Sequence, residues 1–265
     1  MAHFPQLISG ASAQYPLRKT RVTRSVVNAL GDGSMVRWQD PGHRHLRWEL
    51  EMRGLTVREW GAIQSLFEAS EGRLRRFTFC DPSDNLLAAS EDFSATVWQP
   101  GPLLLIEGNV ADPFAGQRAF RITNGGQTRA ALAQPVNAPG DFQYCFSVFA
   151  RALPAGQIYL RRATAGGSQA ESLALTSAWR RVQSSGNLNT AESPIEFGVE
   201  LDPGASCELF GAQVDAQPAP SAYRKTGSRG GVHPTARFED DELSVVAEGS
   251  DNYSITVRIV APVQD

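Results

Sequence analysis

One stretch of the sequence, residues 55–87, contains the only strong amphipathic helix pattern, followed by a glycine, a short strand and a turn, whereas the rest of the chain is typical of strands and turns. Thr56 and Glu59 have capping-box spacing, so a helix should begin at Val57. Its apolar side chains recur every 3.6 residues and need a sheet to cover. Gly72 suits the left-handed position after the helix. A chain with one helix among many strands is predicted to be mainly β.

The residues before this helix predict a β-hairpin and a half-buried strand. Residues 21–30 and 34–39 flank a Gly-Asp-Gly turn, whose residues tolerate positive φ. A loop at Pro41 and Gly42 should follow. Residues 45–53 then alternate apolar with charged side chains, as a strand with one buried face does. This strand should belong to the sheet that the helix covers.

After residue 87 the chain consists of short apolar runs separated by Gly, Pro, Asn and Ser, without helical periodicity. Short strands at such spacing favour a sandwich or jelly roll. Residues 224–234 should form a flexible, basic connection. The eight expected strands are residues 103–107, 118–122, 143–150, 157–162, 172–175, 180–184, 195–201 and 207–214.

The last residues return to the pattern of the first ones. Residues 243–259 predict a terminal hairpin, and two strands alone cannot bury a core. The hairpin must therefore join the N-terminal sheet. We expect a discontinuous domain, residues 1–88 plus 229–265, with a β-sandwich inserted at residues 89–228.

Five segments of the expected first domain carry a family resemblance: FPQLISG, LGDGS, RWELEMRGLT, EWGAIQSLFEASEGRLRRFTFCDPSDNLL and the closing DNYSITVRIVA. They resemble the distal-tail and tail-tube-related proteins of bacteriophages, prophages and gene-transfer particles. The resemblance implies a tail-tube-like β-sandwich with one flanking helix. It also implies a hexameric ring that continues the tail tube.

Four segments of the insert carry a second resemblance: SEDFSATVW at 90–98, YCFSVFARA at 144–152, SAWRRVQSSGNL at 177–188 and LFGAQVDAQPAPSAY at 209–223. They are similar to the carbohydrate-binding-module-like jelly rolls of phage tail proteins. The resemblance implies an inserted jelly roll that binds glycan during host adsorption.

Together the resemblances predict a virion structural protein of the tail tip, made in the host bacterial cytoplasm. The implied partners are further copies in a hexameric ring, the tail tube, hub or baseplate proteins, and host cell-surface glycan. One alternative is a receptor- or carbohydrate-binding tail protein that its first domain anchors. Another is a tail-associated glycan hydrolase.

Motifs for other chemistry are missing from the sequence. We see no nucleophile elbow, phosphate-binding loop or paired-carboxylate signature, so no enzyme and no cofactor are expected, although a glycosidase needs no such motif. His43 and His45 lack a third metal ligand. A net charge of −3 gives no attraction to nucleic acid, and the longest apolar run, residues 103–106, cannot insert into a membrane. The three cysteines should be free thiols, with a disulfide between Cys145 and Cys207 as the alternative.

Two sets of residues are candidates for binding. Sugars stack on aromatic faces, and loops 124–128 and 187–190 could add polar contacts. An extended N-terminal arm without packing periodicity is suited to lie on a neighbouring subunit. The glycan candidates are Trp98, Tyr144, Tyr159 and Trp179, and the interface candidates are Phe4, Pro5, Leu7 and Tyr15.

Overall fold

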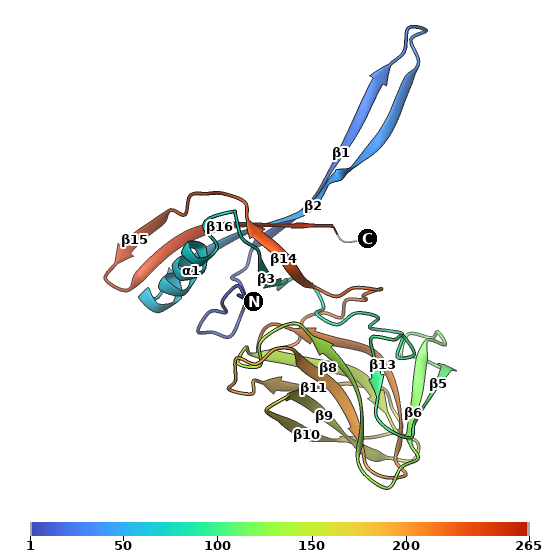
Figure 1. Ribbon diagram of the computed structural model, residues 1–265. Helices are drawn as coiled ribbons and strands as arrows, with labels where there is room; N and C mark the ends of the chain where they lie inside the picture. The colour runs from blue at the N-terminus through green and yellow to red at the C-terminus, as the bar shows by residue number, and fades with distance from the viewer. Residues whose placement is uncertain (1, 264–265) are drawn as a thin grey trace. The chain divides into compact units, whose positions relative to one another are not determined.

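The structure is a computed structural model that describes residues 2–263, and the chain forms two compact units (Figure 1). Within the described residues, the first unit comprises 2–7, 13–79 and 233–263, and the second comprises 8–12 and 80–232. Over these described residues the fold is mainly β with one helix, as predicted. Residues 80–88, expected in the first domain, belong to the second unit because Leu86 and Leu87 are buried in its core.

The first unit is built on one sheet. Its strand order is β1 (Leu17–Ala29), β2 (Met35–Leu55), β16 (Asn252–Pro262), β14 (Val232–Phe238) and β3 (Phe77–Cys80), and β15 (Val245–Gly249) pairs with β16. The C-terminal strand β16 thus lies inside the sheet, with Ile259 opposite Trp48 of β2. The prediction of a flexible connection over residues 224–234 is wrong for its last residues. The strand β14 already begins at Val232, and its residues Ala236 and Phe238 are buried.

The helix α1 (Val57–Ala69) covers the apolar face of this sheet. Thr56 accepts a hydrogen bond from the Glu59 backbone, and the Glu59 side chain accepts one from the Thr56 backbone, so the predicted capping box is confirmed. Ile63 and Leu66 are buried against the strands. The core around them is aromatic, because Trp48 and Phe79 pack edge to face with ring centres 5.1 Å apart.

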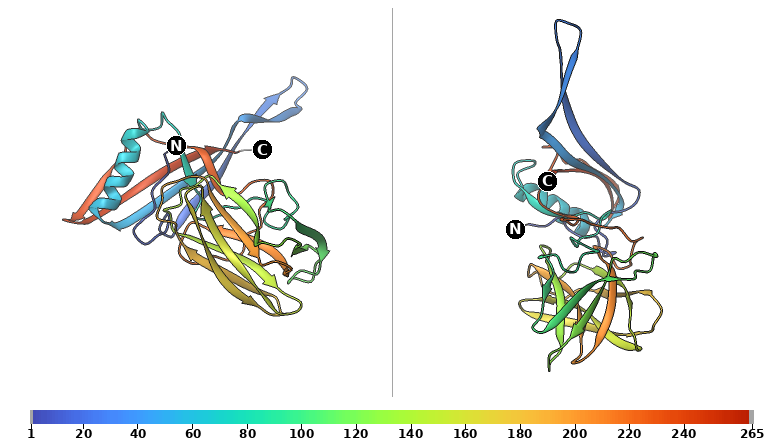
Figure 2. Two further views of the ribbon diagram at one scale, coloured as in Figure 1. Left: turned by 60° about the horizontal axis from the view of Figure 1, so that its bottom comes forward. Right: turned by 90° about the vertical axis from the view of Figure 1, so that its right-hand side faces the viewer.

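The hairpin of β1 and β2 is longer than predicted. The expected loop at Pro41 and Gly42 is wrong, because β2 runs through these residues and the pairing with β1 shifts register between Val22 and Arg24. The extra residues of β2 are absorbed in this bulge, where a proline breaks no ladder bond. Beyond the bulge the hairpin extends clear of the rest of its own unit (Figures 1 and 2).

The N-terminal segment packs on the core of its own unit. Phe4 is 3% exposed and its ring contacts Phe79 at 5.7 Å, while its backbone N–H donates to Thr78 at 2.9 Å. Leu7 is also buried. The prediction of a free arm that offers Phe4 and Leu7 to a neighbour is therefore wrong: these side chains fill the space beside β3. Of the other candidates, Pro5 is half-buried and Tyr15 is exposed.

The second unit is a sandwich of two antiparallel five-stranded sheets (Figure 2). Inward-facing aliphatic and aromatic side chains from both sheets fill its core. The first sheet has the order β10 (Gly167–Leu175), β9 (Gly156–Thr164), β12 (Ile195–Leu201), β7 (Ala130–Val136) and β4 (Gln99–Pro100). The second has the order β11 (Arg180–Gly186), β8 (Tyr144–Arg151), β13 (Ser206–Asp215), β6 (Ala119–Asn124) and β5 (Leu104–Val110).

All three cysteines are buried free thiols, so the alternative of a disulfide between Cys145 and Cys207 is wrong. Burial raises the pKa of Cys80 to about 12, which keeps that thiol protonated and unreactive. Among residues 2–263, no helix is both long and apolar enough to cross a membrane.

Candidate functional site

A polar cluster around Tyr159 lies on the outer face of the first sheet of the sandwich. Strand register brings it together: Leu201 of β12 lies opposite Ala130 of β7, so the next residue, Asp202, meets Arg129. On the other side of β12, Tyr159 lies opposite Glu200. Residues more than seventy positions apart in the sequence thus converge at one end of the sheet.

Asp202 is the hub of this cluster. Its carboxylate accepts hydrogen bonds from the Tyr159 hydroxyl at 2.9 Å, from Gln157 at 3.0 Å and from Arg129 at 3.1 Å. The Arg129 guanidinium also lies 3.6 Å from the centre of the Tyr159 ring. The four side chains therefore hold one another in a fixed arrangement at the surface.

These contacts fix the charges of the cluster. The hydrogen bonds from Gln157 and Tyr159 lower the pKa of Asp202, and the bond to Asp202 raises the pKa of Tyr159. At neutral pH the carboxylate is ionised and the phenol is protonated. The cluster therefore offers an acceptor, a guanidinium donor, an amide and an aromatic ring within one small area.

The polar surface continues along the sheet. Arg161 of β9 pairs with Glu200 at 3.1 Å and with Glu196 at 3.5 Å. Gly198 lies between these carboxylates on β12, and a Cβ there would come within 2.7 Å of the Leu132 carbonyl. The result is a strip of paired charges with a glycine between its two carboxylates, and these groups can exchange hydrogen bonds with a polar ligand.

Trp179 lies on the other sheet, before β11, and is half-buried. The Arg151 guanidinium lies 4.8 Å from its ring centre, and Glu208 bridges Arg151 at 2.6 Å and Arg121 at 2.7 Å. Among the described residues the Trp179 indole N–H finds no hydrogen-bond partner. The two partly exposed candidates, Tyr159 and Trp179, are therefore on different sheets and do not form one site.

The other two glycan candidates are core residues, so their prediction as binding residues is wrong. Trp98 is 3% exposed, and its indole N–H donates to the Ala89 carbonyl at 3.1 Å. Tyr144 is fully buried, donates to the Pro139 carbonyl at 2.8 Å, and has its pKa raised by burial. Neither ring has a face that a ligand can reach.

A third aromatic surface was not predicted. Phe114 is 58% exposed and caps a cluster of rings on the outer face of the second sheet, at 5.5 Å from Phe149 and 5.8 Å from Phe210. Asp112 fixes this loop by accepting from the Phe114 backbone at 2.8 Å and from the Arg118 side chain at 2.8 Å. The sequence signal was the Asp-Pro-Phe-Ala-Gly turn at 112–116, which presents an aromatic residue at a loop tip.

The expected polar loops have different roles. Asn124 is buried and donates to the Thr128 and Leu201 carbonyls, so loop 124–128 is held by its own side chain. Thr190, in loop 187–190, lines a hollow of about 300 Å³ together with Thr164 and Glu192. Within residues 2–263, no three His, Cys, Asp or Glu side chains are grouped so that they could hold a metal ion.

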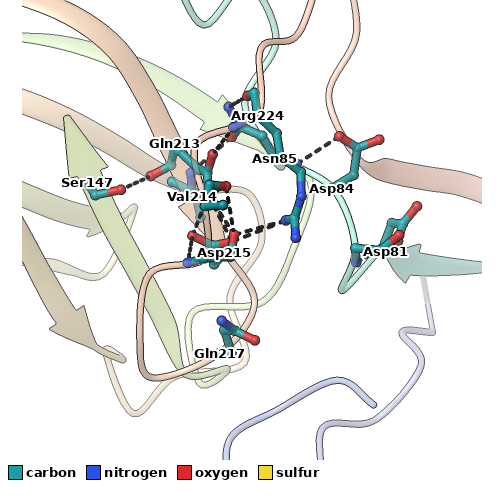
Figure 3. A network of polar contacts seen from close by, with 12 residues as sticks. Asp81, Asp84, Asn85, Ser147, Gln213, Val214, Asp215, Gln217 and Arg224 are labelled. Carbon is teal, nitrogen blue, oxygen red and sulfur yellow. Dashed lines mark hydrogen bonds and ion pairs between the residues drawn. The ribbon is translucent and has the colours of Figure 1, made fainter. Parts of the chain in front are cut away.

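A buried network holds the incoming and outgoing segments of the second unit side by side (Figure 3). Asn85 donates to the Ala212 carbonyl at 2.9 Å and the Arg224 carbonyl at 3.2 Å. Its amide oxygen accepts from the backbones of Leu87 and Val214, each at 3.0 Å. One side chain thus ties residues 85–87 to β13 and to the chain after it.

The same network continues through β13. Gln213 donates to Asp215 at 2.9 Å and accepts from the Arg224 backbone at 2.7 Å. Ser221 also donates to Asp215 through its hydroxyl. These groups satisfy one another's hydrogen-bonding capacity, so we interpret the network as structural.

The sequence matches no protein-family model and no curated protein. Among solved structures, the chain is similar to the CBM22-1 xylan-binding domain of Paenibacillus barcinonensis Xyn10C, with 12% identity, a TM-score of 0.41, and coverage of 52% of this chain and 97% of that domain. It is similar to a xylan-binding domain of CBM 22 with 12% identity, a TM-score of 0.42, and coverage of 52% and 99%. It is also similar to the enzymatically active domain of tailspike protein 4 from bacteriophage CBA120, with 9% identity, a TM-score of 0.39, and coverage of 52% and 22%. The two-sheet architecture of the second unit is established by its strand pairing and not by these similarities.

Proposed function

We propose that the protein is a structural subunit of a phage or phage-like tail, which forms a ring at the distal end of the tail tube and displays a glycan-binding module. The first unit would make the ring, with copies of itself, the tail tube and hub proteins as partners in the virion. The second unit would bind host cell-surface glycan. The sequence resemblance motivates the proposal, and one structural feature of each unit supports it.

The exposed, two-stranded end of the β1–β2 hairpin supports the proposal that the first unit assembles with partners. Beyond the bulge, and among the residues that the structure describes, each strand pairs only with the other, from Arg24 opposite Asp40 to Ala29 opposite Met35. A two-stranded ribbon is marginally stable in water, and exposed apolar groups on it favour burial against a partner. Five large apolar side chains of the ribbon are exposed, namely Val27, Leu30, Met35, Val36 and Trp38.

Assembly is tested by making one face of this ribbon polar. Val36 and Trp38 lie two residues apart on β2 and so face the same side. The double variant V36T/W38S should fold but yield far fewer assembled tails, because the contact loses its apolar surface. Val246→Ser removes an apolar side chain from β15 that is 61% exposed, against 39% for Val36 and 47% for Trp38, and is the control outside the ribbon.

The readout is a count of complete tails in particle preparations, with sedimentation of the purified chain beside it. Tails that assemble normally with V36T/W38S would remove the hairpin from the interface. Normal tails in the absence of the whole protein would overturn the structural role.

The Tyr159 cluster supports glycan binding. A sugar ring presents C–H groups on its faces and hydroxyls at its edge, so it is matched by an aromatic ring beside paired donors and acceptors. Tyr159, Arg129, Asp202 and Gln157 provide this combination, and the strip of Arg161, Glu200 and Glu196 continues it. Binding at one site would be weak, and a ring of copies would strengthen it through multivalency.

Glycan binding is tested with purified protein on a panel of bacterial surface polysaccharides, followed by calorimetry on any that bind. Tyr159→Ala should weaken binding at least tenfold, because the ring and the bond to Asp202 are both lost. Trp179→Ala, on the other sheet, is the matched comparison and should leave this binding unchanged. Equal binding by Tyr159→Ala and the parent would contradict the site, and release of shortened saccharide would favour the hydrolase alternative.

A further inference from the structure

A hollow at one end of the sandwich is separate from the Tyr159 cluster. Its volume is about 300 Å³, at the lower end of the range for small-ligand pockets. One wall is formed by the turn between β9 and β10 and the residues after it, and the other by residues 188–192, which precede β12. Thr164, at the end of β9, lies five residues after Tyr159, or about 16 Å along the strand.

Glu192 carries the only charged side chain among the described residues that line the hollow. The Gly166 backbone N–H donates to its carboxylate at 2.8 Å, which holds the carboxylate against the turn. A Cβ at position 166 would come within 2.8 Å of both carboxylate oxygens, so any other residue there would push the carboxylate away. Within residues 2–263, Glu192 forms no ion pair. Its negative charge can therefore be matched by a cationic group of a ligand.

Hydrogen-bonding groups surround this carboxylate. Glu192 is exposed, so attraction between charges would be weak by itself. Thr164, Ser168, Gln169 and Thr190 add hydroxyl and amide groups to the lining. The Thr164 hydroxyl oxygen is buried and finds no hydrogen-bond partner among residues 2–263, which is unfavourable until another molecule supplies one. These groups favour a ligand that carries several hydroxyls beside its cationic group.

Leu188 adds an apolar side chain to the same lining. It packs partly against the sandwich core and is half-buried. A sugar ring has C–H groups on its faces and hydroxyls at its edge, and a protonated amine on it would meet Glu192. We propose that this hollow binds a single sugar residue that carries a free amino group. The inference rests on the proposed glycan-binding function and adds the class of sugar.

The test uses glucosamine as the probe and N-acetylglucosamine, whose nitrogen is uncharged, as the comparison. The full-length protein should bind glucosamine at least tenfold more tightly in titrations followed by NMR at about pH 6, where amines are protonated. Raising the salt concentration from about 0.05 to 0.5 M should reduce this difference, because it comes from charge. Equal binding of the two sugars would overturn the proposal.

Methylammonium separates recognition of a sugar from attraction to a bare cation. It carries the charge without the hydroxyl groups, so it should bind at least tenfold more weakly than glucosamine. Equal binding of methylammonium and glucosamine would overturn the assignment of a sugar.

Two glutamates of the second unit provide a matched pair of variants. Glu192→Gln keeps an oxygen that can accept from the Gly166 backbone, so it should fold, and it should weaken glucosamine binding at least tenfold. Glu171 of β10 is exposed and lies outside the lining, so Glu171→Gln removes the same charge and should bind glucosamine as the parent does. Equal losses in both variants would show general attraction to negative charge and overturn the site.

The inference and the proposed function can fail separately. If a surface polysaccharide binds through Tyr159 and glucosamine binds no better than N-acetylglucosamine, the glycan-binding function stands and the amino-sugar site is overturned. If glucosamine binds through Glu192 and no polysaccharide of the panel binds, the amino-sugar site stands and the glycan-binding function is contradicted.

Discussion

Asp112 shows how a single carboxylate can fix a loop tip. It accepts from the backbones of Phe114 and Gly116 and from the Arg118 side chain, so the turn that carries Phe114 depends on its charge. Burial pushes the pKa of Asp112 upward, but the hydrogen bonds from Arg118 and the three backbone groups outweigh it and hold the pKa at about 2. The loop is thus maintained wherever this carboxylate is ionised.

Because Asp112 is held ionised in the folded protein, we expect part of the protein's stability to be lost in acid. Its pKa in the folded protein, about 2, lies below its ordinary value of 3.8. The stabilisation is therefore complete above 3.8 and is lost as pH falls toward 2. Asp112→Asn should be less stable than the parent at neutral pH, and the difference should shrink in this acid range. Urea unfolding between pH 2 and 6 measures it, and parallel curves for the two proteins would contradict the role of Asp112.

The candidate site could be predicted from the sequence only in part. On β8, Tyr144, Phe146 and Val148 point inward and Phe149 points outward, although all four are apolar. Composition therefore does not tell a core aromatic from a surface one when both faces of a strand are covered. The Tyr159 cluster could not be predicted from the sequence for another reason. Arg129 and Asp202 lie beside Tyr159 because of the register of β7, β9 and β12, which the sequence alone does not reveal.

At the scale of elements, the helix start and the pairing of the terminal hairpin with the N-terminal sheet were predicted correctly, whereas strands that depend on their partners were missed or cut short. The capping box set the start of α1 because its hydrogen bonds join residues three apart. In contrast, β7 was missed, because its sequence contains Pro135 and several alanines, which are rare in strands. It is nevertheless a strand because β12 pairs with it from Ala130 to Val136. β2 likewise continues through Pro41 because β1 pairs on both sides of the bulge.

The four hydrogen bonds of the Asn85 side chain give a prediction about the stability of the second unit. Asn85→Ala should destabilise the second unit by about 3 to 5 kcal/mol, because four backbone groups lose their partner and three of these hydrogen bonds are buried. Asn187→Ala, in a loop of the same unit, should cost only about 0.5 kcal/mol or less. Chemical denaturation of the three proteins makes the comparison. A similar small cost at both positions would show that residues 81–90 are held by packing alone.

At the scale of the molecule, the position of β16 gives a prediction about the first unit. Deletion of residues 243–265 removes β15 and β16, and β16 lies between β2 and β14 in the sheet. The buried face around Trp48 would then be open to water, so the first unit should unfold. The second unit should stay folded, because every strand in both of its sheets lies within residues 80–232.

Limited proteolysis with mass spectrometry tests this expectation. The truncated chain should yield a protected fragment close to residues 80–232, whereas the full chain should also protect the first unit. Full protection of the first unit after truncation would show that β1, β2 and α1 can fold without the C-terminal strands.

β3 and β14 are neighbours in the sheet of the first unit, and every strand of the second unit comes between them in the chain. The Asp81 backbone N–H donates to the Gly231 carbonyl at 2.8 Å, so the chain returns to the place that it left. The second unit thus occupies the position of a hairpin turn. In genetic terms it is a cassette, which a single in-frame recombination event can exchange or delete while the sheet keeps its strands. Lineages that carry this gene can therefore change the inserted sandwich while they inherit the same sheet.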